Sequence, residues 1–515
     1  MPDPAKRPRD GAHWPAVLAV LGAAGVVLPP FAVVTYPPIT DLPFHAAQSA
    51  IFLHFSDPAY RFAEQFSLHP LEAPYVVTYL VTAALGSVLP IRIAASITAA
   101  LCLLAPAAGL AALLRGIGKS PLLATLAFGL VWNNLAHWGF LSFLLGLGLE
   151  LASVGVALAT ARDPTRRRAA SLAVLLVAVF FAHPFRFPFA LAGVGLVTLL
   201  AAPASAARRQ LAAAAATSAM PFLAWLLVRP AELSPPIELG WPDPSRVLDA
   251  PRHLFDGFRA GTDVGAEERS LALALAASLV VVIAAILIAR RREPKRPPWP
   301  AARRGATVVA ALVGAHALAY FVLPMKIGEW WYVYPRELLC AAVAALAWVP
   351  ELPVWPKLRL AVVAVAIAAS TRMTTLVTRE WAGFERATED FRAVVRAVPP
   401  APRLAYLVFD HRGASQTHSP FVHLPAWVQA ERGGWLSFHF ATWGLYPVRY
   451  RAGGDVPPPL PLAFEWRPQD FRLLQLGWFD ALLVRHTVEP APIVAADPGL
   501  KLAAHEGTWW LYVRR

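Results

Sequence analysis

The sequence of 515 residues has few charged side chains and few cysteines. Only 15% of the residues are Asp, Glu, Lys or Arg, whereas 57% are hydrophobic, and the mean hydropathy is +0.49. This composition excludes a soluble fold. The two cysteines, Cys102 and Cys340, both lie inside apolar runs, so the chain offers neither a disulfide framework nor a thiolate metal site.

Long apolar segments are what the sequence has in abundance. A bilayer core of about 30 Å requires roughly 20 apolar residues in a helix, because lipid cannot satisfy backbone amides. We predict eleven crossings, near residues 14–34, 93–114, 120–136, 138–160, 169–183, 187–203, 210–228, 270–289, 304–323, 337–349 and 357–371. The first crossing is expected to remain as an anchor, since the TYPPIT sequence after it lacks a small-residue cleavage site.

The positive charges set the expected orientation. The net charge is +13, but no basic stripe interleaves with exposed aromatic residues, so nucleic acid is not an expected partner. Lys and Arg instead crowd into alternate connections, such as 161–168 and 290–304, which the positive-inside rule assigns to the cytoplasm. The amino terminus is then cytoplasmic, and the loop at 35–92 lies outside.

One further apolar segment, APYVVTYLVTAALGSVL at 73–89, conflicts with this scheme. If it crossed the membrane, every downstream connection would change side, and the cationic 161–168 cluster would lie outside. We therefore predict a re-entrant or surface-lying helix.

From Thr375 onward the apolar runs shorten to strand length, as in LAYLVFD, FDALLVRH, LKLAAH and TWWLYVRR. The predicted fold is therefore a mainly α, polytopic transmembrane helix bundle at 1–371, followed by a small extracytoplasmic α/β domain at 372–515. The stretches His418–His423 and Trp435–Trp443 give that domain an aromatic-rich surface, suited either to sugar stacking or to docking on the membrane.

The first external loop begins with an acidic residue followed closely by a histidine. Pro43 suits the first turn of a helix, so we predict a helix from there to about Leu53, with Asp41 at its entrance and His45 one turn away. Asp41 then has two interpretations. It caps the helix, which is worth about 1 kcal/mol, or it acts as a general base with His45 as its partner.

The end of the same loop holds His69 and Glu72, which are candidate substrate-binding residues. Together with Asp41 and His45 they could also bind a divalent metal ion, although their spacing matches no diagnostic metal motif. The metal stays an open alternative.

This layout resembles that of the GT-C type glycosyltransferases, polytopic membrane enzymes that use polyprenyl-phosphate sugars. The resemblance rests on the external loop that opens with Asp41 and closes with His69-Pro70, on the WGFLSFLLGLGLEL stretch at Trp138–Leu151, and on the carboxyl-terminal external domain. The chain departs from better-known members in having a single Asp in ITDLP and HPLEAP instead of a His-Pro-Pro run.

The resemblance implies a reaction and a location. A sugar would move from a polyprenyl-phosphate carrier to an extracytoplasmic lipid, glycan or protein, in a bacterial-type plasma membrane. Asp41 would deprotonate the acceptor hydroxyl as the lipid phosphate leaves, with inversion.

A leaving phosphate needs a cation in a low-dielectric place. Arg336, in KIGEWWYVYPRELL, is the first candidate, and Lys326 and Glu329 lie in the same predicted loop. Arg186 and His183, in AHPFRFPF, are the second. For both arginines the alternative is contact with lipid headgroups at the interface.

Three further expectations complete the sequence analysis. His316, in the middle of a predicted span, is expected to make an interhelical hydrogen bond. A transporter or flippase of a lipid-linked sugar is an alternative function, although ionisable residues in the deep spans are few. A noncatalytic membrane anchor for 372–515 is another, but an anchor does not need eleven spans.

Overall fold

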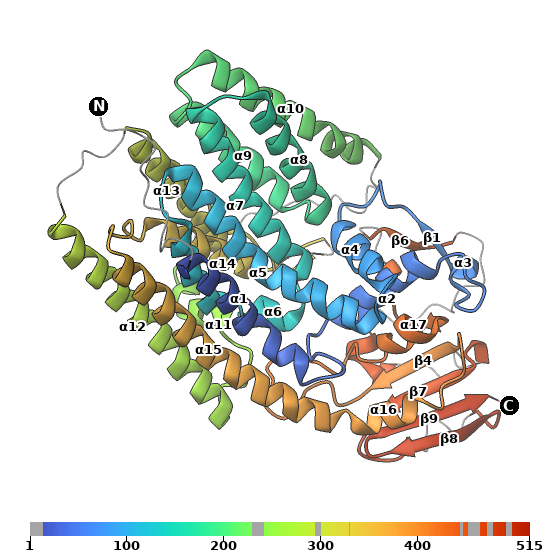
Figure 1. Cartoon of the computed structure of the whole chain (residues 1–515). Coiled ribbons are helices and arrows are strands. Elements are labelled where there is room, and N and C mark those ends of the chain that lie inside the picture. Colours follow the sequence, from blue (N-terminus) through green and yellow to red (C-terminus); the bar gives the residue numbers. More distant parts are fainter. Residues whose placement is uncertain are drawn as a thin grey trace.

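The computed structural model describes residues 14–228, 242–293, 300–328, 330–442, 446–451, 464–470, 477–490 and 497–514. Long helices form a bundle, and a mixed sheet with short helices lies at one end of it (Figure 1). This confirms the predicted class, a mainly helical polytopic membrane protein with a carboxyl-terminal α/β domain.

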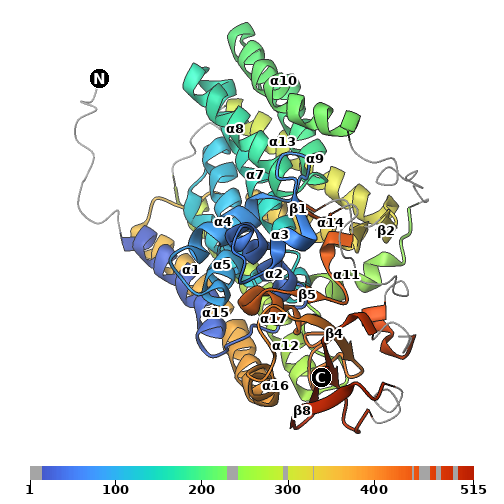
Figure 2. The same ribbon diagram turned by 90° about the vertical axis from the view of Figure 1, so that its right-hand side faces the viewer.

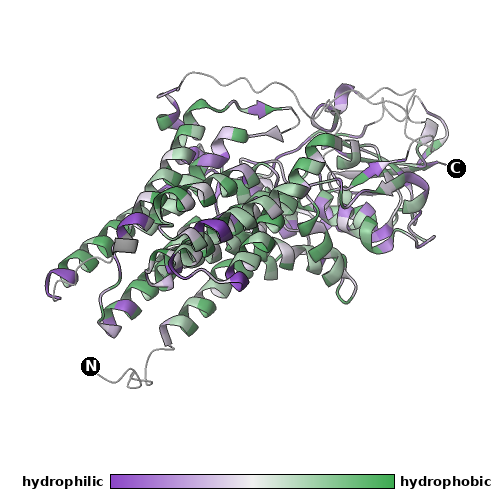
Figure 3. Cartoon of the chain, turned by 90° about the horizontal axis from the view of Figure 1, so that it is seen from above, coloured by the Kyte–Doolittle hydropathy of each residue, from purple (hydrophilic) through white to green (hydrophobic). Residues whose placement is uncertain are grey.

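Seven helices in the described ranges are long and apolar enough to cross a bilayer. They are α1 (Trp14–Ala32), α5 (Ile91–Ile117), α7 (Leu141–Arg162), α10 (Ser205–Val228), α12 (Asp263–Arg291), α13 (Pro300–Val322) and α15 (Pro356–Ala387). Apolar residues dominate these helices, as Figure 3 shows. The most apolar part of α12 is only 11% buried, and Leu273 and Val280 point outward. Such an outward apolar face suits lipid, so the chain is an integral membrane protein with several spans.

The other four predicted crossings are shorter. The helices α8 (Arg166–Ala182), α9 (Arg186–Leu200) and α14 (Val333–Ala345), the last continued by the 3-10 turn η3 (Leu346–Trp348), follow three of them. The segment at 120–136 is not one helix: Ser120 and Pro121 start the 3-10 helix η1 (Pro121–Leu130), and Asn133 caps a separate short helix, α6 (Asn134–Trp138). The Asn133 side chain accepts a hydrogen bond from the backbone amide of Ala136, which starts α6 as a helix separate from η1.

The apolar segment at 73–89 forms α4 (Val77–Gly86), which packs between α2 and α5. Ten residues of α-helix span about 15 Å, roughly half of the hydrocarbon core. The helix is thus too short to cross alone, and its re-entrant or surface-lying position stays a prediction.

The first loop folds onto the carboxyl-terminal domain. Its helix α2 (Leu42–His54) begins next to Pro43, as predicted, and packs against α17 (Ala426–Arg432). Further along, β1 (Phe66–Leu68) pairs antiparallel with β6 (Val448–Tyr450). Figure 2 shows α2 lying beside α17 and β5. The two predicted domains therefore share contacts around the start of the loop.

The carboxyl-terminal sheet has five strands in the order β5-β4-β7-β9-β8. The four predicted strands are confirmed as β4 (Arg403–Val408), β7 (Ala481–Arg485), β8 (Leu500–Glu506) and β9 (Trp509–Arg514), and β5 (Trp435–Leu436) adds an edge. Strands β4 and β7 are parallel, whereas β9 runs antiparallel to β7 and β8. Helix α15 runs without a break through the boundary predicted at 371.

The remaining elements are short. They are α3 (Phe62–Gln65), α11 (Arg246–Leu254), α16 (Glu389–Val395), the hairpin of β2 (Lys326–Ile327) and β3 (Trp330–Trp331), and the 3-10 helices η4 (Phe440–Thr442), η5 (Phe464–Trp466) and η6 (Pro468–Asp470).

Small residues bring α5 and α7 unusually close. A Cβ atom built on Gly109 would lie 2.1 Å from the carbonyl oxygen of Gly148, and one on Gly116 would lie 2.5 Å from that of Gly155. Since no real side chain fits these distances, the two glycine pairs fix how α7 sits in the bundle. Helix α7 carries Glu150, a buried acid described below.

Candidate functional site

Asp41 lies at the entrance of α2, but its side chain does not cap that helix. Its backbone amide donates to the carbonyl of Trp138 over 3.1 Å, and its carboxylate oxygen Oδ1 lies 3.1 Å from Nδ1 of His423. Gly139 makes this approach possible, because its φ is +91° and a Cβ there would lie 2.9 Å from the Asp41 nitrogen. The carboxylate is therefore directed at a histidine and not at the helix.

His423 comes from the carboxyl-terminal domain and is buried. Its ring lies 4.7 Å from that of Phe44, 5.8 Å from that of Phe440 and 5.9 Å from that of Trp466. The sequence placed it in an aromatic surface stretch, but the packing of α17 on α2 buries it instead. Trp443, in the second such stretch, lies outside the described residues.

His45 is partly buried next to Asp41 but uses both ring nitrogens elsewhere. Nε2 lies 3.2 Å from the carbonyl oxygen of Gly139, which can only accept, so Nε2 donates and Nδ1 accepts from the Tyr79 hydroxyl at 3.0 Å. Burial lowers the pKa of His45, and the Asp41 carboxylate opposes that shift only in part. This ring is a neutral support for the turn at Gly139.

Arg336 is buried at the start of α14, and among the described residues it has no acidic partner. Its Nε and Nη2 donate to the carbonyls of Tyr332 and Trp331 over 3.1 and 2.6 Å, and Nη1 lies 3.3 Å from Nε2 of His183. The Phe140 ring lies 4.1 Å from the centre of the guanidinium. No carboxylate in the described part of the chain lies within 4.0 Å of it. A buried cation without a counter-ion is costly, so the place favours an anionic ligand.

Two tryptophans connect Asp41 with Arg336. The Trp138 carbonyl accepts from Asp41, and the Trp331 carbonyl accepts from Arg336. The two indole rings meet edge to face with their centroids 5.2 Å apart. The backbone of Asp41 and the guanidinium of Arg336 are thus each held by a tryptophan, and the rings of these two tryptophans are in contact.

A tyrosine lies within the field of both charges. Burial raises the pKa of Tyr446, the Asp41 carboxylate adds to that rise, and the Arg336 guanidinium opposes it. The Tyr446 ring lies 5.7 Å from that of Tyr75, whose ring in turn lies 5.1 Å from His183. Asp41, His423, Tyr446, His183 and Arg336 therefore form one region, which we call the candidate site.

Arg186, at the start of α9, lies in a fully buried ionic network. Its guanidinium lies 3.3 Å from a carboxylate oxygen of Glu150 and also pairs with Glu337. The imidazole of His316 bridges the same two acids, at 3.0 Å from Glu150 and 2.8 Å from Glu337. The expected interhelical bond of His316 is present, and Arg186 contacts acids where we had expected a substrate.

The other predicted residues lie elsewhere. His69 and Glu72 contact each other at 3.2 Å, and Arg449 holds the far oxygen of Glu72 at 3.0 Å. Lys326 is exposed on the β2–β3 hairpin, and Glu329 lies outside the described residues. His69 still borders the site, because its backbone amide donates over 2.7 Å to Pro447, the neighbour of Tyr446.

Comparison with solved structures shows which proteins share this architecture. ArnT from Cupriavidus metallidurans bound to undecaprenyl phosphate superposes with a TM-score of 0.56 at 14% identity, covering 97% of this chain and 98% of that chain. The fold of the present chain is similar to that of ArnT. The apo ArnT structure gives a TM-score of 0.53 at 12% identity, with 97% of each chain covered.

The predicted GT-C layout is confirmed by this similarity at the level of the fold. The mycobacterial arabinofuranosyltransferase AftD also matches, with a TM-score of 0.49 at 17% identity over 98% of this chain and 40% of that chain. No protein-family model matches the chain, and a comparison with curated proteins gives no match at the sequence level.

Whether this chain can bind a metal ion must be judged from its own residues. Asp41, His45, His69 and Glu72 do not gather around a common centre, because His45 faces Tyr79 and Gly139 while His69 and Glu72 pair with each other. In the described ranges, the group with metal-ligand spacing is His316, Glu337 and Cys340, whose ligand atoms lie within 4.8 Å of one another.

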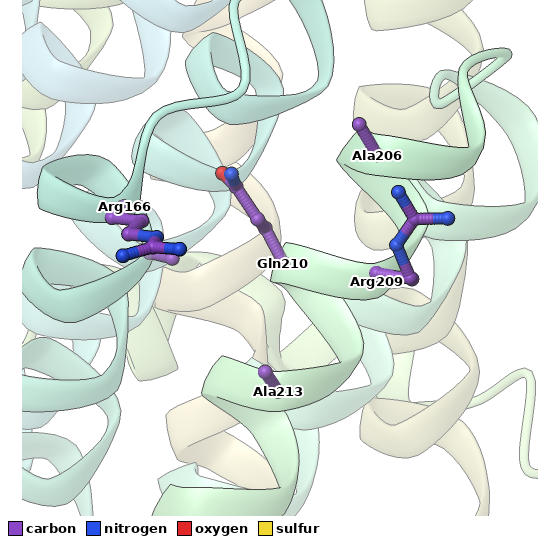
Figure 4. Close-up of a pocket in the computed structure, with 6 residues that line it drawn as sticks. Arg166, Ala206, Arg209, Gln210 and Ala213 are labelled. Atoms are coloured by element: carbon purple, nitrogen blue, oxygen red, sulfur yellow. The ribbon is translucent and has the colours of Figure 1, made fainter.

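A cavity of about 280 Å³ opens between α8 and α10, away from the candidate site (Figure 4). Its lining residues are Arg166, Ala169, Ala206, Arg209, Gln210 and Ala213. With no histidine or carboxylate in this lining, the cavity offers no general base.

Several residues of the candidate site and of the buried ionic network were not predicted. His423 is separated from Asp41 by the whole transmembrane domain, and nothing local in the sequence marks it. Glu150 and Glu337 did leave a signal, because an acidic residue inside an apolar span is rare and needs a partner.

Proposed function

We propose that this protein is a membrane glycosyltransferase that moves a sugar from a polyprenyl-phosphate donor to an extracytoplasmic acceptor. The observation that carries the proposal is the buried guanidinium of Arg336, which has no carboxylate partner among the described residues and acts on the same tyrosine, Tyr446, as the Asp41 carboxylate. The similarity to ArnT, whose structure holds undecaprenyl phosphate, supports the same class of ligand here.

The reaction is a single displacement at the anomeric carbon. The acceptor hydroxyl oxygen forms the new glycosidic bond, while the bond from the anomeric carbon to the phosphate oxygen breaks and polyprenyl phosphate leaves with the electron pair. The hydroxyl proton passes to the Asp41 carboxylate, and the configuration at the anomeric carbon inverts. His423 holds the carboxylate of Asp41 in place at 3.1 Å.

Arg336 stabilises the negative charge that grows on the departing phosphate. Its three described hydrogen bonds use three of five N–H donors, so two remain for phosphate oxygens. A preorganised cation in a dry site is worth far more than one in water. The edge-to-face rings of Trp138 and Trp331 offer apolar faces for the sugar between base and cation.

The proposed orientation follows the positive-inside rule. The amino terminus lies in the cytoplasm, and the candidate site and the carboxyl-terminal domain lie on the opposite face. In this orientation the proposed sugar transfer occurs outside the cytoplasm.

A transporter is favoured by one observation, the buried network of four ionisable residues between α7, α9, α13 and α14. Intramembrane charges often mark transport pathways. Here each of them is paired within the network, whereas Arg336 is not, so we prefer a site that binds an anion and releases it.

Binding of undecaprenyl phosphate to the purified protein tests the proposal. We expect Arg336→Gln to raise the Kd roughly 10- to 100-fold, because charge-assisted hydrogen bonds are worth about 1.5–3 kcal/mol. Arg246→Gln is the matched control, since Arg246 also donates to two backbone carbonyls but has Asp243 at 3.7 Å. Equal Kd values for wild type and Arg336→Gln contradict the proposal.

A further inference from the structure

The buried network next to the candidate site is closed and fully shielded from solvent. It joins Glu150 on α7, Arg186 on α9, His316 on α13 and Glu337 on α14, and each of these four side chains has 0% exposure. The contact between Arg186 and Glu150 measures 3.3 Å, and Arg186 also pairs with Glu337. His316 completes the ring, at 3.0 Å from Glu150 and 2.8 Å from Glu337.

The geometry fixes the protons on His316. Both ring nitrogens face a carboxylate oxygen, and an ionised carboxylate can only accept a hydrogen bond. With both carboxylates ionised, Nδ1 and Nε2 both carry hydrogen, which makes the ring an imidazolium. With Arg186 it supplies two positive charges against the two negative charges of Glu150 and Glu337, so the network as a whole is neutral.

A metal ion does not explain the same residues. The His316, Glu337 and Cys340 ligand atoms are close enough for one, but the Arg186 guanidinium lies 3.1 Å from the Cys340 sulfur and also contacts Glu337. A guanidinium in this position repels a metal cation. The group is suited to holding a proton.

Arg336 lies immediately beside this network. It is the chain neighbour of Glu337, and its guanidinium faces the same Phe143 ring as that of Arg186, at 5.6 and 5.0 Å from the ring centroid. Arg186 and Glu337 are both close enough to act electrostatically on Arg336. The charge of the network thus determines how much of the positive charge of Arg336 is left for a ligand.

We propose that the His316 imidazolium neutralises the two buried acids so that the charge of Arg336 remains available to a lipid phosphate. His316 is then a positioning residue, which acts through Arg336 and not on the substrate. This inference rests on the proposed function, because it assigns the phosphate to Arg336. Without the proton on His316, the network carries one net negative charge beside Arg336 and competes with the phosphate.

Charge-changing variants of the network test this role, with undecaprenyl phosphate as the probe and detergent-purified full-length protein. His316→Gln leaves an uncompensated acid, so the Kd is expected to rise about tenfold, and the KM for a lipid-linked donor rises with it while kcat changes by less than about threefold. In His316→Gln/Glu150→Gln the network is neutral again, and the Kd should return to within about threefold of wild type.

Glu150→Gln alone is the variant that separates charge from packing. It disturbs the same ring but removes a negative charge, so binding should be unchanged or tighter. An unchanged Kd in His316→Gln overturns the inference, as does equal weakening of binding in Glu150→Gln and His316→Gln. If His316→Gln does not fold, the Kd of Glu150→Gln decides: an unchanged or lower Kd supports the inference, and a higher Kd overturns it. Wild-type protein that fails to bind the lipid overturns the proposed function instead, and this inference with it.

Discussion

The imidazole Nδ1 of His423 lies 3.1 Å from the carboxylate Oδ1 of Asp41, although the two residues belong to opposite ends of the chain. The contact forms because α17 packs on α2, which places a histidine of the carboxyl-terminal domain over the entrance of the first loop helix. Both domains thus contribute residues to the candidate site, and the carboxyl-terminal domain supplies His423.

His423→Gln is expected to lower kcat roughly tenfold. The glutamine lacks the aromatic ring that packs beside Phe44 and Trp466 and faces the Asp41 carboxylate at 3.1 Å, and a tenfold lower kcat corresponds to about 1.4 kcal/mol of lost transition-state stabilisation. Steady-state turnover with the KM for the donor checks this. His505→Gln, on the exposed strand β8, serves as the control, and a kcat equal to that of the control contradicts the positioning role of His423.

Gly139→Ala should disturb the site without touching any reactive group. The residue has φ +91°, where alanine is strained by about 1–2 kcal/mol, and the new Cβ would lie 2.9 Å from the Asp41 nitrogen. We expect a lower thermal midpoint together with reduced turnover. Gly195→Ala in α9 is the control. A Cβ there meets nothing within 4 Å and alanine favours the helix, so this variant should keep the wild-type thermal midpoint and turnover. Wild-type turnover in Gly139→Ala shows that the close approach is not needed.

The stability of the protein should fall on mild acidification because of His418. Burial lowers the pKa of this histidine from 6.5 to about 4, and its Nε2 donates to the Pro38 carbonyl at 2.7 Å. Above pH 6.5 the ring is neutral in both the folded and the unfolded chain. Between pH 6.5 and about 4 only the unfolded chain takes up the proton, so stability decreases as the pH falls.

At about pH 5 the loss is on the order of 2 kcal/mol. Thermal unfolding at pH 7 and pH 5 measures it, and His418→Gln, which keeps a donor for Pro38, should lose less on acidification. A midpoint that falls equally in wild type and His418→Gln shows that other groups cause the acid sensitivity.

Much of the fold was predictable from local patterns. Long apolar runs indicated the membrane helices, short apolar runs indicated the four strands, and Pro43 marked the start of α2, because each of these signals lies within one segment. Arg336 and Asp41 were proposed as site residues from their position at the predicted membrane faces. What links them, through the carbonyls of Trp138 and Trp331, depends on how distant segments pack.

The assignment of Arg186 shows the limit of such reasoning. A short turn with His183 and Arg186 indicated a surface role, but α9 turns this guanidinium inward, where Glu150 and Glu337 are within reach. An acid on one span and a cation on another can be recognised as partners only when the helix order in the bundle is known. His423 was hidden for the same reason.

The central claim is that Asp41 removes the acceptor proton while Arg336 holds the lipid phosphate, and turnover by Asp41→Asn tests it most directly. Loss of a general base costs about a hundredfold or more in rate. The account predicts that loss in sugar transfer from a polyprenyl-phosphate donor, with undecaprenyl phosphate still bound at the wild-type Kd, and near-normal transfer by Asp57→Asn, an exposed acid of the same loop. Wild-type turnover in Asp41→Asn would contradict it.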